Sequence, residues 1–172
     1  LDEELPLWVP IPPLAEVQVA LERAVADVTQ LDGFELKKIL RTGTVATTET
    51  GGAPLEYAVA TGPIRVAGTP YLTGTLTALG VNNRAFYGLA VGTSPADAHL
   101  VQNNVLPLST TAPVVGEHRR VDLPSVAVDV PAGQTLYVLA SPVSDTFVGM
   151  GSRTPGAVVL EDTAVHLPVV GR

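Results

Sequence analysis

From Gly43 onward the chain is a series of short runs rich in Val, Thr, Leu and Tyr, separated by Gly, Pro and Asn. Such runs are typical of β-strands joined by turns, at the spacing of a sandwich or barrel. The pattern therefore predicts a mainly β fold, an antiparallel β-sandwich that is jelly-roll-like. The expected strands are 55–61, 64–66, 71–79, 85–92, 99–105, 119–123, 127–130, 135–141, 146–148, 158–160 and 164–168.

Three stretches make this prediction specific. In 71–79, Thr or another surface-tolerant residue alternates with Leu, Gly and Ala, which describes a strand with one wet face. The sequence V-N-N-R at 81–84 predicts a turn, because Asn tolerates positive φ. The valine strand 126–130, the turn P-A-G-Q at 131–134 and the aliphatic run that follows predict a hairpin over 126–139.

The first 31 residues predict a docking element of two parts. Four prolines within 1–13 prevent a helix, so an extended arm is expected. Residues 14–31 place apolar side chains at i, i+3 and i+4, which predicts one amphipathic α-helix ending before Asp32-Gly33. Residues 34–40 fit either a further helical turn or a strand. The side chains expected to contact a partner are Leu5, Leu7, Trp8, Val9, Ile11, Leu14, Val17, Leu21, Val25 and Val28.

Length and charge narrow the class of protein. At 172 residues the chain fits one domain with an appendage, 1–42 as arm plus helix and 43–172 as the sandwich. A net charge of −7, with lysine only at Lys37 and Lys38, argues against nucleic-acid binding, which needs clustered cations. The apolar runs are too short for a membrane span. With no cysteine, disulfides and thiolate zinc modules are excluded.

No constellation of side chains predicts catalysis, a cofactor or a metal. Neither Ser141 nor Ser152 lies in a Gly-x-Ser-x-Gly elbow, and His99, His118 and His166 lack metal-ligand spacing. Loop carboxylates could converge on calcium or form an acid–base pair, but no motif supports either, and such residues commonly cap turns. These are Asp122, Asp129, Asp145, Glu161 and Asp162. We therefore expect no catalytic, cofactor-binding or metal-ligating residue, and no enzymatic activity of this chain alone.

Three segments of the β-rich part share a pattern of Gly and Pro around Val-rich strands. They are G-P-I-R-V-A-G-T-P at 62–70, V-D-L-P at 121–124 with A-V-D-V-P-A-G-Q-T-L at 127–136, and S-R-T-P at 152–155 with V-H-L-P-V-V at 165–170. They resemble the non-catalytic C-terminal sandwich domain of the X-Pro dipeptidyl-peptidase and cocaine-esterase type of α/β-hydrolase, although Gln134 stands where that family often has His.

The resemblance covers about two thirds of the chain, from 62 to 172. Members carry their Ser-Asp-His machinery in a separate catalytic domain, and none of that set has a counterpart here. The resemblance therefore implies an accessory domain that packs against a hydrolase domain, helps to wall its substrate cleft, or supports oligomerisation.

A structural protein fits the same pattern. Viral decoration or fibre proteins, and trimeric complement-like heads, also resemble one jelly roll preceded by an apolar arm. In either interpretation residues 1–31 contact a protein partner, another copy or the chain's own body, and the chain is extracellular or virion-associated. The two interpretations differ in assembly: the accessory domain is a monomer that folds without its arm, and the structural protein is an obligate oligomer.

Overall fold

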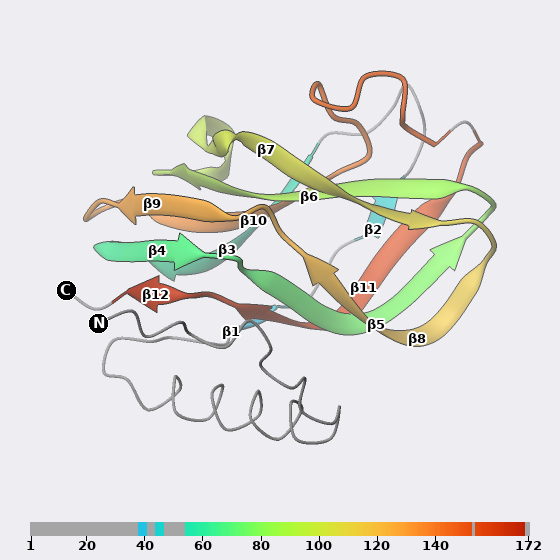
Figure 1. Cartoon of the computed structure of the whole chain (residues 1–172), viewed down its shortest axis with the longest axis horizontal. Helices are drawn as coiled ribbons and strands as arrows, with labels where there is room; N and C mark the ends of the chain where they lie inside the picture. Colours follow the sequence, from blue (N-terminus) through green and yellow to red (C-terminus); the bar gives the residue numbers. More distant parts are fainter. Residues whose placement is uncertain (1–37, 41–43, 47–53, 153, 171–172) are drawn as a thin grey trace, which may run out of the picture.

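Antiparallel strands make up most of the residues that the computed structural model describes, which are 38–40, 44–46, 54–152 and 154–170 (Figure 1). Within these ranges the one helical segment is the 3₁₀ turn η1 (Pro95–Asp97). The predicted arm and helix, 1–31, lie outside the described residues. Of the two alternatives for 34–40, its described part, Lys38–Leu40, is a strand. The strands are β1 (Lys38–Leu40), β2 (Thr44–Ala46), β3 (Leu55–Thr61), β4 (Ile64–Gly68), β5 (Tyr71–Leu79), β6 (Asn83–Gly92), β7 (His99–Thr110), β8 (Val114–Asp122), β9 (Val126–Val130), β10 (Thr135–Ser141), β11 (Ala157–His166) and β12 (Val169–Val170).

The strands form two layers. The first layer holds β1, β11, β5 and β8 in this order, with β2 also paired to β11. The second holds β3, β10, β6 and β7, and a short sheet holds β12, β4 and β9. Every pair is antiparallel. The predicted antiparallel β-sandwich is confirmed.

The short sheet continues the first layer across a row of prolines. Pro70 lies between β4 and β5, Pro124 between β8 and β9, and Pro168 between β11 and β12, so the order β12-β4-β9 repeats β11-β5-β8. Proline has no N–H for a strand ladder, which breaks each long strand at this row. Hydrogen bonding continues through proline carbonyls: Leu123 N donates to Pro70 O at 3.0 Å, and Ala67 N donates to Pro168 O at 3.0 Å. We call Pro70, Pro124 and Pro168 the proline row.

The core lies between the two layers. In β5, Leu72 and Leu76 are buried and the threonines between them are half-buried, which confirms the predicted alternation. These leucines belong to one cluster with Leu89 of β6 and Val138 of β10. Each such side chain contributes about 1.5–3 kcal/mol on full burial. Burial also raises the pKa of Tyr87 in this cluster, so its phenol stays neutral at physiological pH.

Strand β6 is buried on both faces. Ala85, Tyr87 and Leu89 face the core cluster between the layers. Phe86, Gly88 and Ala90 are buried on the opposite, outer side of the strand. There Phe86 stacks on Phe147 of the 142–150 loop, with ring centroids 5.7 Å apart. A Cβ at Gly88 would lie 2.8 Å from the carbonyl oxygen of Asn104, so β7 also covers this face closely. This double burial explains why 85–92 reads as a nearly continuous apolar run.

Several predicted strands have the observed bounds, and two predictions were wrong. Strands 55–61, 71–79 and 135–141 match β3, β5 and β10. Residues 146–148 form a turn instead of a strand, with Phe147 N donating to Ser144 O and Met150 N donating to Phe147 O. The stretches 158–160 and 164–168 are not two strands, because β11 runs through both with a register shift between Glu161 and Ala164.

The predicted hairpin over 126–139 was also wrong. Its turn exists: Gln134 N donates to Pro131 O at 3.1 Å, and Gly133 has a φ of +83°. However, β9 pairs with β4, while β10 pairs with β3 and β6, so the turn carries the chain from one layer to the other. Local turn chemistry reverses the chain direction, but burial against other strands decides which partner each strand takes.

Replacing Gly133 by Val is expected to lower the free energy of unfolding by about 1–3 kcal/mol, because a β-branched residue is strained at positive φ. No atom lies within 4 Å of the position of a Cβ at Gly133, so the loss comes from backbone conformation alone. Gly133→Asn is the matched control and should cost less, since Asn tolerates this conformation. Urea denaturation measures both variants, and wild-type stability of the Val variant would contradict the turn.

Candidate functional site

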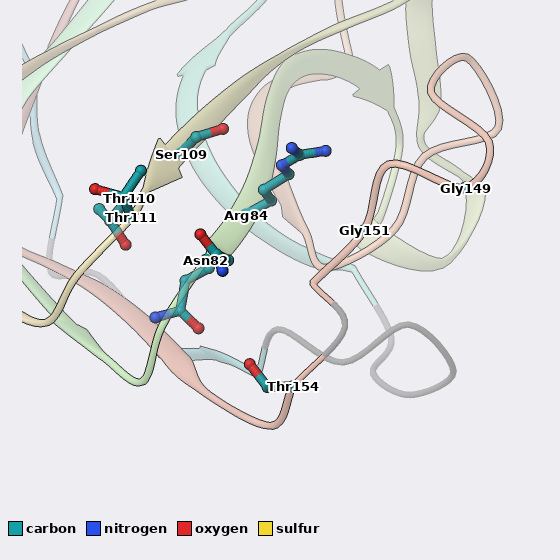
Figure 2. Close-up of a pocket in the computed structure, with 9 residues that line it drawn as sticks. Asn82, Arg84, Ser109, Thr110, Thr111, Gly149, Gly151 and Thr154 are labelled. Atoms are coloured by element: carbon teal, nitrogen blue, oxygen red, sulfur yellow. The ribbon is translucent and has the colours of Figure 1, made fainter.

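A polar pocket opens at the end of the sandwich where β5 turns into β6 and β7 ends. These strand ends are on the right in Figure 1. Three segments line it: the start of β6 with the preceding turn, the end of β7, and the loop before β11 (Figure 2). Its volume is about 300 Å³. We call it the end pocket; its lining residues are Asn82, Asn83, Arg84, Ser109, Thr110, Thr111, Gly149, Gly151 and Thr154.

The β5–β6 turn is shaped by its two asparagines. Asn82 has a φ of 52°, as expected from V-N-N-R, and its N–H donates to Thr111 O at 3.2 Å. Asn83 is fully buried, and its Nδ2 donates to Leu79 O at 2.9 Å. A Cβ at Gly156 would lie 2.0 Å from Asn83 Oδ1, so only glycine fits beside this amide. The turn thus contacts the end of β7 through Thr111 and the loop before β11 through Gly156.

Hydrogen bonds tie the loop before β11 to β6 and to the turn that precedes β6. Arg84 N donates to Ser152 Oγ at 2.7 Å, and Arg84 Nη1 donates to Met150 O at 2.7 Å. Thr154 Oγ1 donates to Val81 O at 2.9 Å. The buried Ser152 hydroxyl therefore bonds to the backbone of β6. Gly149 and Gly151, on either side of Met150, face the pocket in this loop.

The electrostatics of the end pocket centre on Arg84. Its guanidinium points toward the 149–151 loop, while Ser109, Thr110 and Thr111 lie on the other side of Arg84, at and just after the end of the neighbouring strand β7 (Figure 2). None of the nine lining residues is acidic. Thr110 is 6% exposed, and its Oγ1 is buried without a hydrogen-bond partner. A buried unpaired hydroxyl costs free energy, so this atom stands out in the described part of the chain.

Each of the three histidines lies on a β-strand and outside the lining of the end pocket. His99 and His118 are exposed on β7 and β8. His166 stacks on Tyr71, with ring centroids 4.2 Å apart, and its Nε2 lies 3.2 Å from Thr73 Oγ1. The structure therefore places these histidines on three separate strands, β7, β8 and β11.

The loop carboxylates do not come together. Asp122 pairs with Arg120 at 2.8 Å and Asp129 with Arg65 at 2.5 Å, and the hydrogen bond from Arg65 lowers the pKa of Asp129. Both pairs are exposed, so they contribute little to stability. The other three are Asp145 in the loop after β10 and Glu161 and Asp162 on β11. Among the residues with described positions, no group of three or more His, Asp or Glu side chains could hold a metal ion.

The ten predicted docking residues, from Leu5 to Val28, all lie outside the described residues. The structure shows exposed apolar side chains outside this predicted docking set. Val148 is 81% exposed, Met150 45% and Val81 48%, and each is adjacent in sequence to residues that line the end pocket. Arg84 and the Ser-Thr-Thr run at 109–111 were missed as well, because only the fold brings these segments together.

Within the described residues, no helix is long and apolar enough to cross a membrane.

Comparisons with known proteins give partial similarities. No protein-family model matches the chain. AMP nucleosidase from Escherichia coli (strain K12) is 36% identical over 102 residues, which are 58% of this chain and 21% of that protein. The chain thus spans about a fifth of the length of this curated relative.

In fold, the chain is similar to an aminopeptidase from the marine sediment archaeon Thaumarchaeota archaeon, with a TM-score of 0.56 and 12% identity over 83% of this chain and 36% of that chain. A CocE/NonD family hydrolase from Staphylococcus aureus has a TM-score of 0.45 and 12% identity over 77% and 34%. The first similarity supports the sandwich fold.

Replacing Thr110 by Val is expected to raise the free energy of unfolding by about 1 kcal/mol, because it removes a buried unpaired hydroxyl and keeps the β-branched shape. Thr111→Val is the matched control: Thr111 is exposed, so this variant should leave stability unchanged. Thermal unfolding followed by circular dichroism compares them. A loss of stability in Thr110→Val would show that the hydroxyl has a partner.

Proposed function

We propose that this chain is a non-catalytic accessory domain of jelly-roll type that packs against the catalytic domain of a larger hydrolase. The observation that carries the proposal is that most of the hydrolase-like stretches meet in one part of the fold. Stretches 62–70, 121–124, 127–136 and 165–170 are far apart in sequence, yet they supply β4, β9 and β12 and the prolines of the proline row. Ser152 and Thr154 of the remaining stretch, 152–155, lie at the end pocket instead.

The contacts within this region support a common structural role for the stretches that meet there. β4 pairs with β9 from Ile64 to Gly68 and with β12 at Val66. Beside the proline row, Thr69 Oγ1 and Ser125 Oγ lie 2.7 Å apart. Each of these stretches resembles the same family, and they also pair with one another in one sheet. Their pairing supports the resemblance more than any single stretch does.

The order of the strands supports the jelly-roll assignment. When β4–β5, β8–β9 and β11–β12 are each taken as one long strand, the first layer reads β1, β11–β12, β4–β5, β8–β9. The second layer reads β3, β10, β6, β7. Strands from early and late in the chain thus alternate as neighbours, which is typical of two nested Greek keys.

The partial similarities fit a domain within a larger enzyme. The sandwich matches 36% of the aminopeptidase chain, so a related fold exists there beside further structure. A second candidate is a segment of an AMP nucleosidase, favoured by the 36% identity over 102 residues. The two hosts differ in substrate: the full-length protein would hydrolyse an ester or peptide bond in the first case and consume AMP in the second.

Solution mass and truncation test the accessory role. An accessory domain of 17.8 kDa is expected to be a monomer by light scattering and to keep its strand signal in circular dichroism when residues 1–31 are removed. The isolated chain should not hydrolyse chromogenic ester or X-Pro substrates. An obligate trimer that dissociates on this truncation would contradict the proposal and favour the capsid decoration or fibre interpretation.

Replacing Trp8 by Ala is expected to weaken stability or association by about 3–5 kcal/mol, because docking of the arm would bury the indole. Trp8→Phe is the control, since it retains an aromatic side chain. Denaturation and sedimentation of the two variants measure the effect. A change below about 0.5 kcal/mol in Trp8→Ala would mean that the arm covers no surface.

A further inference from the structure

Arg84 differs from the other arginines whose side chains are described. Arg65 pairs with Asp129, Arg119 with Glu117 and Arg120 with Asp122. Arg84 has no carboxylate partner among the described residues; its hydrogen bond goes to a neutral acceptor, the carbonyl oxygen of Met150. The net charge of the protein is −7, yet none of the nine described residues that line the pocket around Arg84 is acidic.

The neutral groups of the end pocket are suited to the same ligand. Ser109, Thr110 and Thr111 bring three hydroxyls, and Asn82 brings an amide. The Thr110 hydroxyl is already desolvated and unpaired, so a ligand oxygen that reached it would gain a hydrogen bond without a further loss of hydration. This buried hydroxyl is a second observation, separate from Arg84, because Thr110 lies on β7 and Arg84 on β6.

We infer that the end pocket binds a carboxylate. A planar guanidinium matches a carboxylate in shape, and one arginine balances one negative charge. A phosphate carries nearly two charges at neutral pH, and the nine lining residues offer one cation to it. The pocket, at about 300 Å³, is large enough for a carboxylate and a small attached group.

The rim indicates what the carboxylate is attached to. Val81, Val148 and Met150 are exposed, adjacent in sequence to lining residues, and uncharged. An apolar group next to the carboxylate would cover these side chains on binding. The chemistry therefore points to an acid with an aliphatic body. A free small acid and the carboxyl terminus of a peptide that ends in an aliphatic residue both have this chemistry.

Titration of the ¹⁵N-labelled full chain with N-acetyl-leucine tests the inference by NMR. Shifts are expected in residues 82–84, 109–111 and 149–154, with a dissociation constant on the order of 1 mM. N-acetyl-leucinamide, which has the same body without the charge, should cause no such shifts. A pentapeptide ending in leucine with a free carboxyl terminus, compared with N-acetyl-leucine, distinguishes a peptide source from a free acid.

Two variants and one control assign the binding to the pocket. Arg84→Gln should weaken the affinity for N-acetyl-leucine by about tenfold or more. Thr110→Val should weaken it while leaving the chain folded, so loss of binding cannot come from unfolding. Arg120→Gln, on the opposite end of the layer beside Tyr71, should bind as the wild type does. Absence of shifts up to about 20 mM, equal binding of the amide, or wild-type affinity in Arg84→Gln would overturn the inference.

Discussion

The missing backbone N–H of three prolines organises the first layer of this sandwich. Three neighbouring strands each contain a proline at the same level, so the ladder must be interrupted there. The interruption is bridged because the carbonyl oxygens of Pro70 and Pro168 accept hydrogen bonds from neighbouring strands. Placing the three breaks in one row keeps the polar backbone paired, whereas scattered prolines would leave unpaired groups in each strand.

The row also separates two regions of the molecule. β5 starts next to Pro70 and ends at the turn that forms the end pocket, and β11 runs back from the loop beside the pocket to the level of Pro168. The hydrolase-like stretches around the proline row therefore lie at one end of the layer, whereas Ser152 and Thr154 of the remaining stretch lie beside Arg84 at the other.

The bounds of a strand were predictable where one of its faces is solvent-exposed, and less predictable where the alternation is interrupted. In 71–79 the alternation of Thr with Leu, Gly and Ala was enough to set both bounds of β5. The prediction of two strands within 158–168 was wrong because an irregularity near Asp162, whose φ is 48°, interrupts the alternation within one strand. The hairpin over 126–139 failed for a different reason: its turn residues act locally, but the partners of β9 and β10 are strands from much earlier in the chain.

The sequence by itself determined most of the strands, the turns at Asn82 and Gly133, and the fold class, an antiparallel sandwich. These follow from interactions between residues a few positions apart. The assignment of strands to layers, the alignment of the prolines and the end pocket depend on contacts between segments dozens of residues apart. Arg84, Thr110 and Met150 carry no mutual pattern in the sequence, since each was placed by the packing of a different strand or loop. Only the tertiary structure brings them to one cavity.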